Sequence, residues 1–285
     1  MTGPAQPAPA ARPERTATLA ISPCPNDTFV FHALIHGLVA GAPAVETTFA
    51  DIDVCNGIAE VSGADLVKIS VAMLPWVLDK YQLLPCGGAV GHGCGPLVLS
   101  RTDTTGIAGA RVAIPGERTT AYQLFQLWTQ SHGGQPAQVV VMPFEQIMPA
   151  VRAGAVDLGL VIHEARFTYP DYGLQQVADL GEWWEADTGL PVPLGAIVAR
   201  RDQDASVWTS AVRSSVEMAW AHPEASREFV RHHAQETAPA VVDAHIRLYV
   251  NEFTRDLGSQ GREAIRVLLG RAAQAGVVPP TPGLL

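Results

Sequence analysis

Short apolar runs alternate with amphipathic segments along most of the chain. The runs are rich in β-branched residues, which is typical of buried strands, and fall at 16–21, 45–50, 65–69, 97–100, 111–114, 139–142, 156–162 and 196–200. Apolar residues recur at helical spacing at 29–38, 54–61, 71–78, 122–128, 144–153, 207–221, 223–233, 240–249 and 261–275. Strands that alternate with helices predict an α/β fold.

The strand–helix units fall into two groups. We expect a larger lobe from residues 16–101 and 196–285, and a smaller lobe, residues 102–195, inserted into it. The proline-containing stretch 189–195 is expected to form a stiff connector between the lobes. Residues 1–15 are rich in Pro and Ala and lack the apolar region of a signal peptide, which predicts a disordered tail.

This outline predicts a two-lobed, periplasmic-binding-protein-like (type II) α/β fold. Each lobe is expected to be a sheet flanked by helices, and a cleft is expected between the lobes. In open α/β sheets, ligands bind beyond the carboxyl ends of the strands, so the polar residues at these ends are the first candidates for a site.

The composition narrows the function classes. Among 285 residues, 19 are basic and 28 acidic, for a net charge of −9, without the basic patch typical of nucleic-acid binding. No apolar run is long enough to span a bilayer. The four cysteines match no zinc spacing and predict reduced thiols. We therefore expect a cytoplasmic protein with a small-molecule partner, and neither a nucleic acid nor a membrane as partner.

Ionisable residues directly follow the apolar run 156–162. His163, Glu164 and Arg166 stand at this strand end. Histidine changes its charge near neutral pH, which makes His163 a candidate general base. The alternative is that His163 only caps the strand through a hydrogen bond to neighbouring backbone.

Three further strand ends carry polar side chains. Asn26 and Asp27 follow the first strand, where they either cap the next helix or help its N–H groups to bind an anion. Lys68 and Ser70 end the third strand, a place that suits either an anion contact or a solvated strand end. Thr119 or Thr120 is expected to cap the helix at 122–128 and to offer a hydroxyl beside its N-terminus.

Cysteines and histidines elsewhere indicate no further chemistry. Cys24 has no basic neighbour in the sequence, which favours a buried, inert thiol over a nucleophile. His232, His233 and His245 fall within predicted helices without acidic partners at ligand spacing. That pattern is typical of surface or interhelix residues rather than metal ligands.

Several linked motifs carry a family resemblance. They are Ser-Pro-Cys-Pro-Asn-Asp-Thr-Phe at 22–29, Lys-Ile-Ser at 68–70, Pro-Gly-Glu-Arg-Thr-Thr-Ala at 115–121, Ile-His-Glu-Ala-Arg-Phe-Thr-Tyr at 162–169, Leu-Pro-Val-Pro-Leu-Gly at 190–195 and Tyr-Val-Asn-Glu-Phe at 249–253. With these motifs in this order, roughly residues 16–285 resemble the 1,4-dihydroxy-6-naphthoate synthases of the futalosine route to menaquinone.

The resemblance implies a two-domain enzyme of the carbon–carbon lyase type that needs no metal or redox cofactor. Its substrate would be cyclic dehypoxanthinyl futalosine, and its products 1,4-dihydroxy-6-naphthoate and a sugar-derived fragment. The family's proton acceptor corresponds to His163. Its substrate contacts correspond to Lys68, Ile69, Ser70, Thr120 and Ala121.

On this basis we hypothesise that Thr120 and the helix start behind it hold a substrate oxygen while His163 abstracts a proton. Glu164 or Arg166 is expected to orient the imidazole. The main alternative is a cytosolic small-molecule binding or sensor protein with the same fold and no catalysis, because a fold does not decide function. A thiol enzyme that uses Cys24 is a third class.

Overall fold

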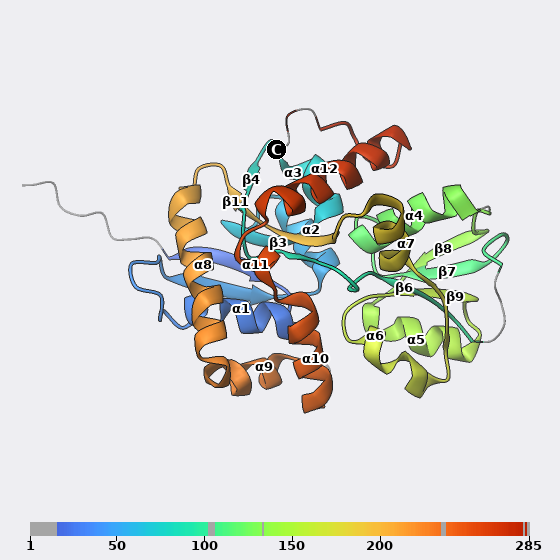
Figure 1. The fold of residues 1–285 in the computed structure, drawn as a ribbon, viewed down its shortest axis with the longest axis horizontal. Coiled ribbons are helices and arrows are strands. Elements are labelled where there is room, and N and C mark those ends of the chain that lie inside the picture. Colours follow the sequence, from blue (N-terminus) through green and yellow to red (C-terminus); the bar gives the residue numbers. More distant parts are fainter. Residues whose placement is uncertain (1–15, 102–105, 133, 235–237, 282, 284–285) are drawn as a thin grey trace, which may run out of the picture.

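The computed structural model describes residues 16–101, 106–132, 134–234, 238–281 and 283. In this part of the chain the strands form two sheets that lie side by side, each flanked by helices (Figure 1). The α/β class expected from the hydrophobic pattern is therefore confirmed. The tail expected at residues 1–15 lies outside the described residues.

The first sheet has six strands. In spatial order they are β2 (Val45–Phe49), β1 (Ala17–Ile21), β3 (Leu66–Ser70), β11 (Val192–Arg200) and β4 (Tyr81–Leu83), and β5 (Ala89–Gly91) also pairs with β11. β1 runs parallel to β2 and β3, whereas β11 runs antiparallel to its partners. The carboxyl ends of β1 and β3 therefore lie at the same edge of the sheet.

The second sheet has five strands. In spatial order they are β10 (Gln175–Asp179), β6 (Leu97–Ser100), β9 (Leu158–Val161), β7 (Arg111–Ile114) and β8 (Gln138–Val141). β7 runs parallel to β8 and β9, and β6 runs antiparallel to β9 and β10. The carboxyl ends of β7 and β9 consequently share an edge, as those of β1 and β3 do.

The chain passes between the sheets at β6 and β11. β6 pairs within the second sheet although it precedes residue 102, and the division into lobes at 101/102 and 195/196 stays a prediction. β11 begins at Val192, so most of the expected connector 189–195 belongs to a strand. The register shifts between Pro193 and Gly195, and such a bulge is a place where a sheet tolerates proline.

Helices flank both sheets (Figure 1). Those that follow the strands of the first sheet are α1 (Pro25–Ile35), α2 (Ile52–Glu60), η1 (Val71–Met73), α3 (Leu74–Val77), α8 (Ala205–Ala221), η3 (Pro223–Ser226), α9 (Arg227–His233), α10 (Pro239–Tyr249), α11 (Glu252–Arg255) and α12 (Gly258–Gln274). Those that follow the strands of the second are α4 (Thr120–His132), α5 (Phe144–Ala153), α6 (Ala165–Thr168), η2 (Tyr169–Tyr172) and α7 (Leu180–Thr188). No described helix is long and apolar enough to cross a membrane.

Large aromatic side chains fill the core while their polar ends stay hydrogen-bonded. Trp184 and Tyr81 are fully buried. Trp184 Nε1 donates to Pro191 O at 3.0 Å, and the Tyr81 hydroxyl donates to Ala64 O at 2.7 Å. These bonds remove the desolvation cost that an unpaired polar atom would add to the burial of each ring.

A buried serine joins α8 to α1. Ser215 Oγ donates to Val30 O at 2.6 Å and accepts from Leu34 N at 3.2 Å. These two groups are four residues apart on α1, so the hydroxyl bridges the donor and acceptor of one helical turn. The bridge fixes α8 against the helix whose first turn enters the site described below.

Replacing Ser215 by Ala leaves both α1 groups without this buried partner. We expect the free energy of unfolding to fall by about 1–2 kcal/mol, measured by urea denaturation. Ser210→Ala, at an exposed position on the same helix, is the matched control and should change stability little. Equal stability of the two variants would contradict the proposed bridge.

Candidate active site

The loops after two pairs of parallel strands line one cavity between the sheets. They follow β1, β3, β7 and β9, and the cavity measures about 60 Å³. Its walls include these expected site residues: Asn26, Asp27, Lys68, Ser70, Thr120, Ala121 and His163. Ile69 does not line it, because side chains alternate along β3 and that of Ile69 is buried in the core.

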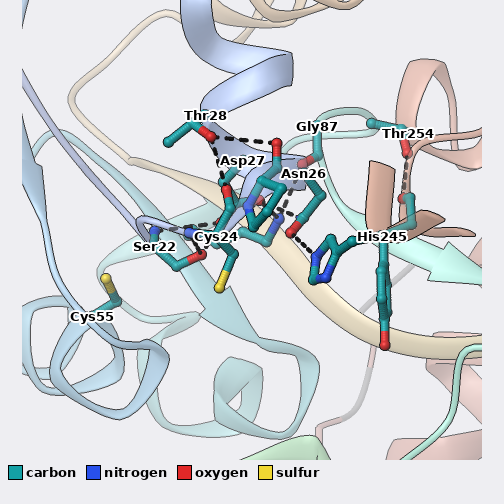
Figure 2. A network of polar contacts seen from close by, with 12 residues as sticks. Ser22, Cys24, Asn26, Asp27, Thr28, Cys55, Gly87, His245 and Thr254 are labelled. Atoms are coloured by element: carbon teal, nitrogen blue, oxygen red, sulfur yellow. Dashed lines mark hydrogen bonds and ion pairs between the residues drawn. The ribbon is translucent and has the colours of Figure 1, made fainter. Parts of the chain in front are cut away.

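A buried ion pair forms the wall on the side of the first sheet. Lys68 Nζ lies 2.6 Å from Asp27 Oδ1, and both side chains are almost fully buried. Asp27 also accepts hydrogen bonds from Ser22 Oγ at 2.7 Å and Asn26 Nδ2 at 2.8 Å (Figure 2). Buried charges need such partners because desolvation of an ion is costly. A substrate anion at Lys68 therefore has to compete with Asp27.

Asn26 and Asp27 do not cap α1. That helix starts at Pro25 with Cys24 at its N-cap, and no side chain caps it. Asn26 instead links the first turn of α1 to α10, since its Oδ1 lies 2.9 Å from His245 Nε2 (Figure 2). The helix-cap alternative for these two residues was therefore wrong.

His245 is the residue of this site that sequence reasoning missed. It was expected at the surface or between helices, and it is fully buried beside Asn26. It precedes Tyr249 by four residues, so both lie on the same face of α10. Tyr249 lines the cavity and begins one of the recognised motifs, which was the available signal.

His163 has the most unusual backbone of the cavity. Its φ is +53°, in the left-handed region that residues other than glycine seldom adopt. Its ring lies edge-on to Phe144, with centroids 5.5 Å apart, and nearly parallel to His245, with centroids 6.1 Å apart. The imidazole makes no hydrogen bond to another described residue, so the strand-cap alternative finds no support in its side chain.

Burial controls the charge of His163. It lowers the pKa of the imidazole to about 4. The negative charge of Asp27 raises this pKa, and the positive charge of Lys68 lowers it further. The sequence-based hypothesis assumed a pKa near neutrality, and the structure places it lower because protein groups surround the ring. His163 is therefore neutral at neutral pH, the form that accepts a proton.

Two hydroxyls near the cavity have different roles. Thr120 Oγ1 accepts from Ala72 N at 3.1 Å and donates to Leu194 O at 2.7 Å, so its proton already has an acceptor. Ser70 Oγ accepts from Asn56 Nδ2 at 3.2 Å, and its own proton has no acceptor among the described residues. Ser70 is thus the better placed of the two to donate to a ligand.

The start of α4 adds further donors. Thr119 caps this helix, because its Oγ1 accepts from Tyr122 N at 3.2 Å. The N–H groups of Thr120 and Ala121 have no acceptor within the described part of the chain, as is usual in a first helical turn. Such groups favour a negatively charged or partly charged oxygen.

Cys24, His163 and Glu164 form the only group of possible metal ligands found within the described residues. Their ligand atoms all lie within 4.8 Å of one another. Burial, and then Glu164, raise the pKa of the Cys24 thiol well above its ordinary value. The thiol therefore remains protonated, which weakens it both as a nucleophile and as a metal ligand.

Arg166 does not orient the imidazole. Its guanidinium donates to Gly95 O at 2.8 Å and pairs with Asp179. Asp179 also caps α7 through Gly181 N and Glu182 N, at 2.8 and 3.1 Å. Arg166 therefore stabilises the second sheet and α7, and of the two expected orienting residues only Glu164 lies close to His163.

Replacing Asp27 by Asn leaves the Lys68 ammonium buried without its counter-charge. We expect the free energy of unfolding to fall by about 3–5 kcal/mol, measured by urea denaturation, whereas the exposed control Asp171→Asn should have little effect. The double variant Asp27→Leu/Lys68→Met should recover much of this loss, because it leaves no unpaired charge. Unchanged stability of Asp27→Asn would show that the pair is unimportant.

The chain matches a family model and two named relatives over nearly its whole length. A family model described as menaquinone biosynthesis matches residues 17–274. The chain is 60% identical to a 1,4-dihydroxy-6-naphthoate synthase from Streptomyces coelicolor, over 93% of this chain and 95% of the relative. It is 46% identical to a 1,4-dihydroxy-6-naphthoate synthase from Thermus thermophilus, over 93% and 96% of the two chains.

The fold is also that of solute receptors. The periplasmic aliphatic sulphonate binding protein SsuA from Escherichia coli superposes with a TM-score of 0.67 at 11% identity, over 96% of this chain and 91% of that one. At this identity the likeness shows the fold alone, and it confirms the periplasmic-binding-protein-like architecture expected from the sequence. Since the family model and both relatives match nearly the whole chain, the chain belongs to the menaquinone biosynthesis family that includes these 1,4-dihydroxy-6-naphthoate synthases.

Proposed function

We propose that the protein converts cyclic dehypoxanthinyl futalosine to 1,4-dihydroxy-6-naphthoate, a reaction of the carbon–carbon lyase type, with His163 as general base. The relatives from Streptomyces coelicolor and Thermus thermophilus are both named for the synthesis of this product. One structural observation carries the proposal. His163 lines the cavity between the sheets, and its backbone has a positive φ. Its imidazole makes no hydrogen bond to another described residue, so the ring is free to meet a substrate.

The state of His163 suits proton removal. Ring opening and aromatisation require that a proton leave a carbon of the substrate, and a neutral imidazole accepts it. Because the pKa is about 4, forming the imidazolium at pH 7 costs about 4 kcal/mol. The Asp27 carboxylate acts against this cost, since its negative charge favours the protonated ring. Aromatisation of the product supplies the driving force.

The remaining donors of the cavity suit a substrate oxygen. The Ser70 hydroxyl at the end of β3 and the N–H groups of Thr120 and Ala121 at the start of α4 all belong to residues that line the cavity. An oxygen held by them would receive hydrogen bonds where negative charge develops. This modifies the hypothesis for Thr120, whose backbone rather than hydroxyl is proposed to make the contact.

Substrate entry requires that the sheets move apart. The cavity of about 60 Å³ is smaller than the roughly 300–1,000 Å³ of sites for drug-sized ligands. Closure around the substrate would then exclude water from the reactive intermediate. We further propose that the reaction takes place in the cytoplasm and uses no metal or redox cofactor, and that the small-molecule substrate is its partner.

Incubation of the purified protein with cyclic dehypoxanthinyl futalosine, without added metal, tests the proposal. We expect dihydroxynaphthoate, detected by chromatography and mass spectrometry. His163→Ala should lower kcat by about 10²–10⁴-fold, the usual contribution of a general base, and Cys24→Ala should keep most of the activity. Tight binding without turnover by the wild type would instead identify a binding or sensor protein. Near wild-type turnover by His163→Ala would refute the base assignment.

The pH dependence of kcat/KM reports the pKa of the base in the free enzyme. His163 is protonated, and hence inactive, only below its pKa of about 4. We therefore expect kcat/KM to be independent of this group from pH 6 to 8 and to fall on the acid side with an apparent pKa of about 4. An acid limb at the ordinary histidine value of about 6.5 would contradict the desolvation of the ring.

A further inference from the structure

The hydrogen bonds around Asn26 determine the tautomer of His245. Asp27 Oδ1 faces the Lys68 ammonium at 2.6 Å, so it accepts hydrogen bonds and donates none. Asn26 meets the same oxygen at 2.8 Å and must present its amide Nδ2 there. Its carbonyl Oδ1 then faces His245 Nε2 at 2.9 Å (Figure 2). Nε2 therefore carries the proton.

His245 Nδ1 is consequently a bare acceptor. The atom is buried and has no hydrogen-bond partner among the described residues. Burial, followed by His163 and Lys68, holds the pKa of His245 well below its ordinary value, so the ring stays neutral. A buried acceptor without a partner destabilises a fold, and native structures retain few of them.

The residues that contact His245 line the cavity. Its ring lies between Asn26, to which it is bonded, and Tyr249, with ring centroids 4.5 Å apart. It is also nearly parallel to His163. Asn26, Tyr249 and His163 all line the cavity, so His245 lies directly behind its wall, and the separation of the sheets proposed for substrate entry would open the wall to a ligand.

We propose that His245 is a second substrate-binding imidazole, whose Nδ1 accepts a hydrogen bond from a hydroxyl group of the bound substrate. The inference rests on the proposed function, because the sugar-derived part of that substrate supplies hydroxyl donors. A carbonyl or carboxylate oxygen does not fit this position, since it would set two acceptors against each other. The relay from Lys68 through Asp27 and Asn26 holds Nδ1 in its accepting form before the substrate arrives.

Two substitutions separate this contact from the structural bond to Asn26. In His245→Gln the side-chain amide replaces Nε2 and keeps the donor to Asn26, but no acceptor remains at Nδ1. In His245→Asn the amide replaces Nδ1 and keeps an acceptor there, but the bond to Asn26 is lost. The exposed His232→Gln is the control for the loss of an imidazole outside the site.

We expect His245→Gln to lower kcat/KM for cyclic dehypoxanthinyl futalosine by roughly 10- to 100-fold, with a melting temperature close to that of the wild type. His245→Asn should melt earlier but lose less than about tenfold in kcat/KM, and His232→Gln should match the wild type. Activity of His245→Gln within about twofold of the wild type would overturn the inference. So would equal losses in the Gln and Asn variants.

Nitrogen NMR of histidine-labelled wild-type protein gives a second test that needs no variant to be active. The bare Nδ1 of His245 should shift toward a hydrogen-bonded value when dihydroxynaphthoate and the sugar-derived fragment, or the substrate in a His163→Ala background, are added. An unchanged Nδ1 signal in a protein that turns over the substrate would overturn the proposed role of His245 and leave the proposed function standing. Absence of both turnover and binding in the wild type would overturn the proposed function, and this inference with it.

Discussion

The buried ion pair between Lys68 and Asp27 is the interaction on which the rest of the site depends. Desolvation of either charge alone is costly, so each must keep the other in place. Asp27 collects hydrogen bonds from Ser22 and Asn26, and these fix the loop between β1 and α1. Through Asn26 the same carboxylate determines the tautomer of His245, and both charges act on the pKa of His163. The ion pair thus determines the tautomer of His245 and modifies the pKa that burial gives to His163.

The fold accommodates this pair by keeping side chains away from it. Gly195 of β11 pairs with Ser70 of the antiparallel neighbour β3, and a Cβ at that position would lie 2.9 Å from Lys68 Cε. Gly88 is similarly close to the backbone of Gly195, where an added Cβ would lie 2.6 Å from the carbonyl oxygen. Glycine at 195 therefore leaves the space that the Lys68 side chain occupies on its way to Asp27, and glycine at 88 lets its segment lie against the backbone of β11.

Much of the site was predictable because it follows from strand ends. Asp27, Lys68 and His163 stand next to short apolar runs, and the carboxyl ends of parallel strands meet in space. The contact of His245 with Asn26 was not predictable, because the two residues are 219 positions apart and lie in two different helices, α10 and α1. The pKa of His163 and the bonds of the Thr120 hydroxyl likewise depend on packing between the two sheets. β4, β5, β10 and α7 were missed for a different reason, since their sequences lack a clear period.

The central claim is that His163 removes a proton from a substrate enclosed between the sheets, and a crystal structure of His163→Ala with unreacted cyclic dehypoxanthinyl futalosine tests it most directly. We predict that the substrate lies between the lobes, with an oxygen on Ser70 and the start of α4. We also predict that the carbon to be deprotonated lies within about one hydrogen-bond length of the site vacated by the imidazole. A substrate bound outside this cavity, or one whose acidic carbon points away from residue 163, would contradict the account.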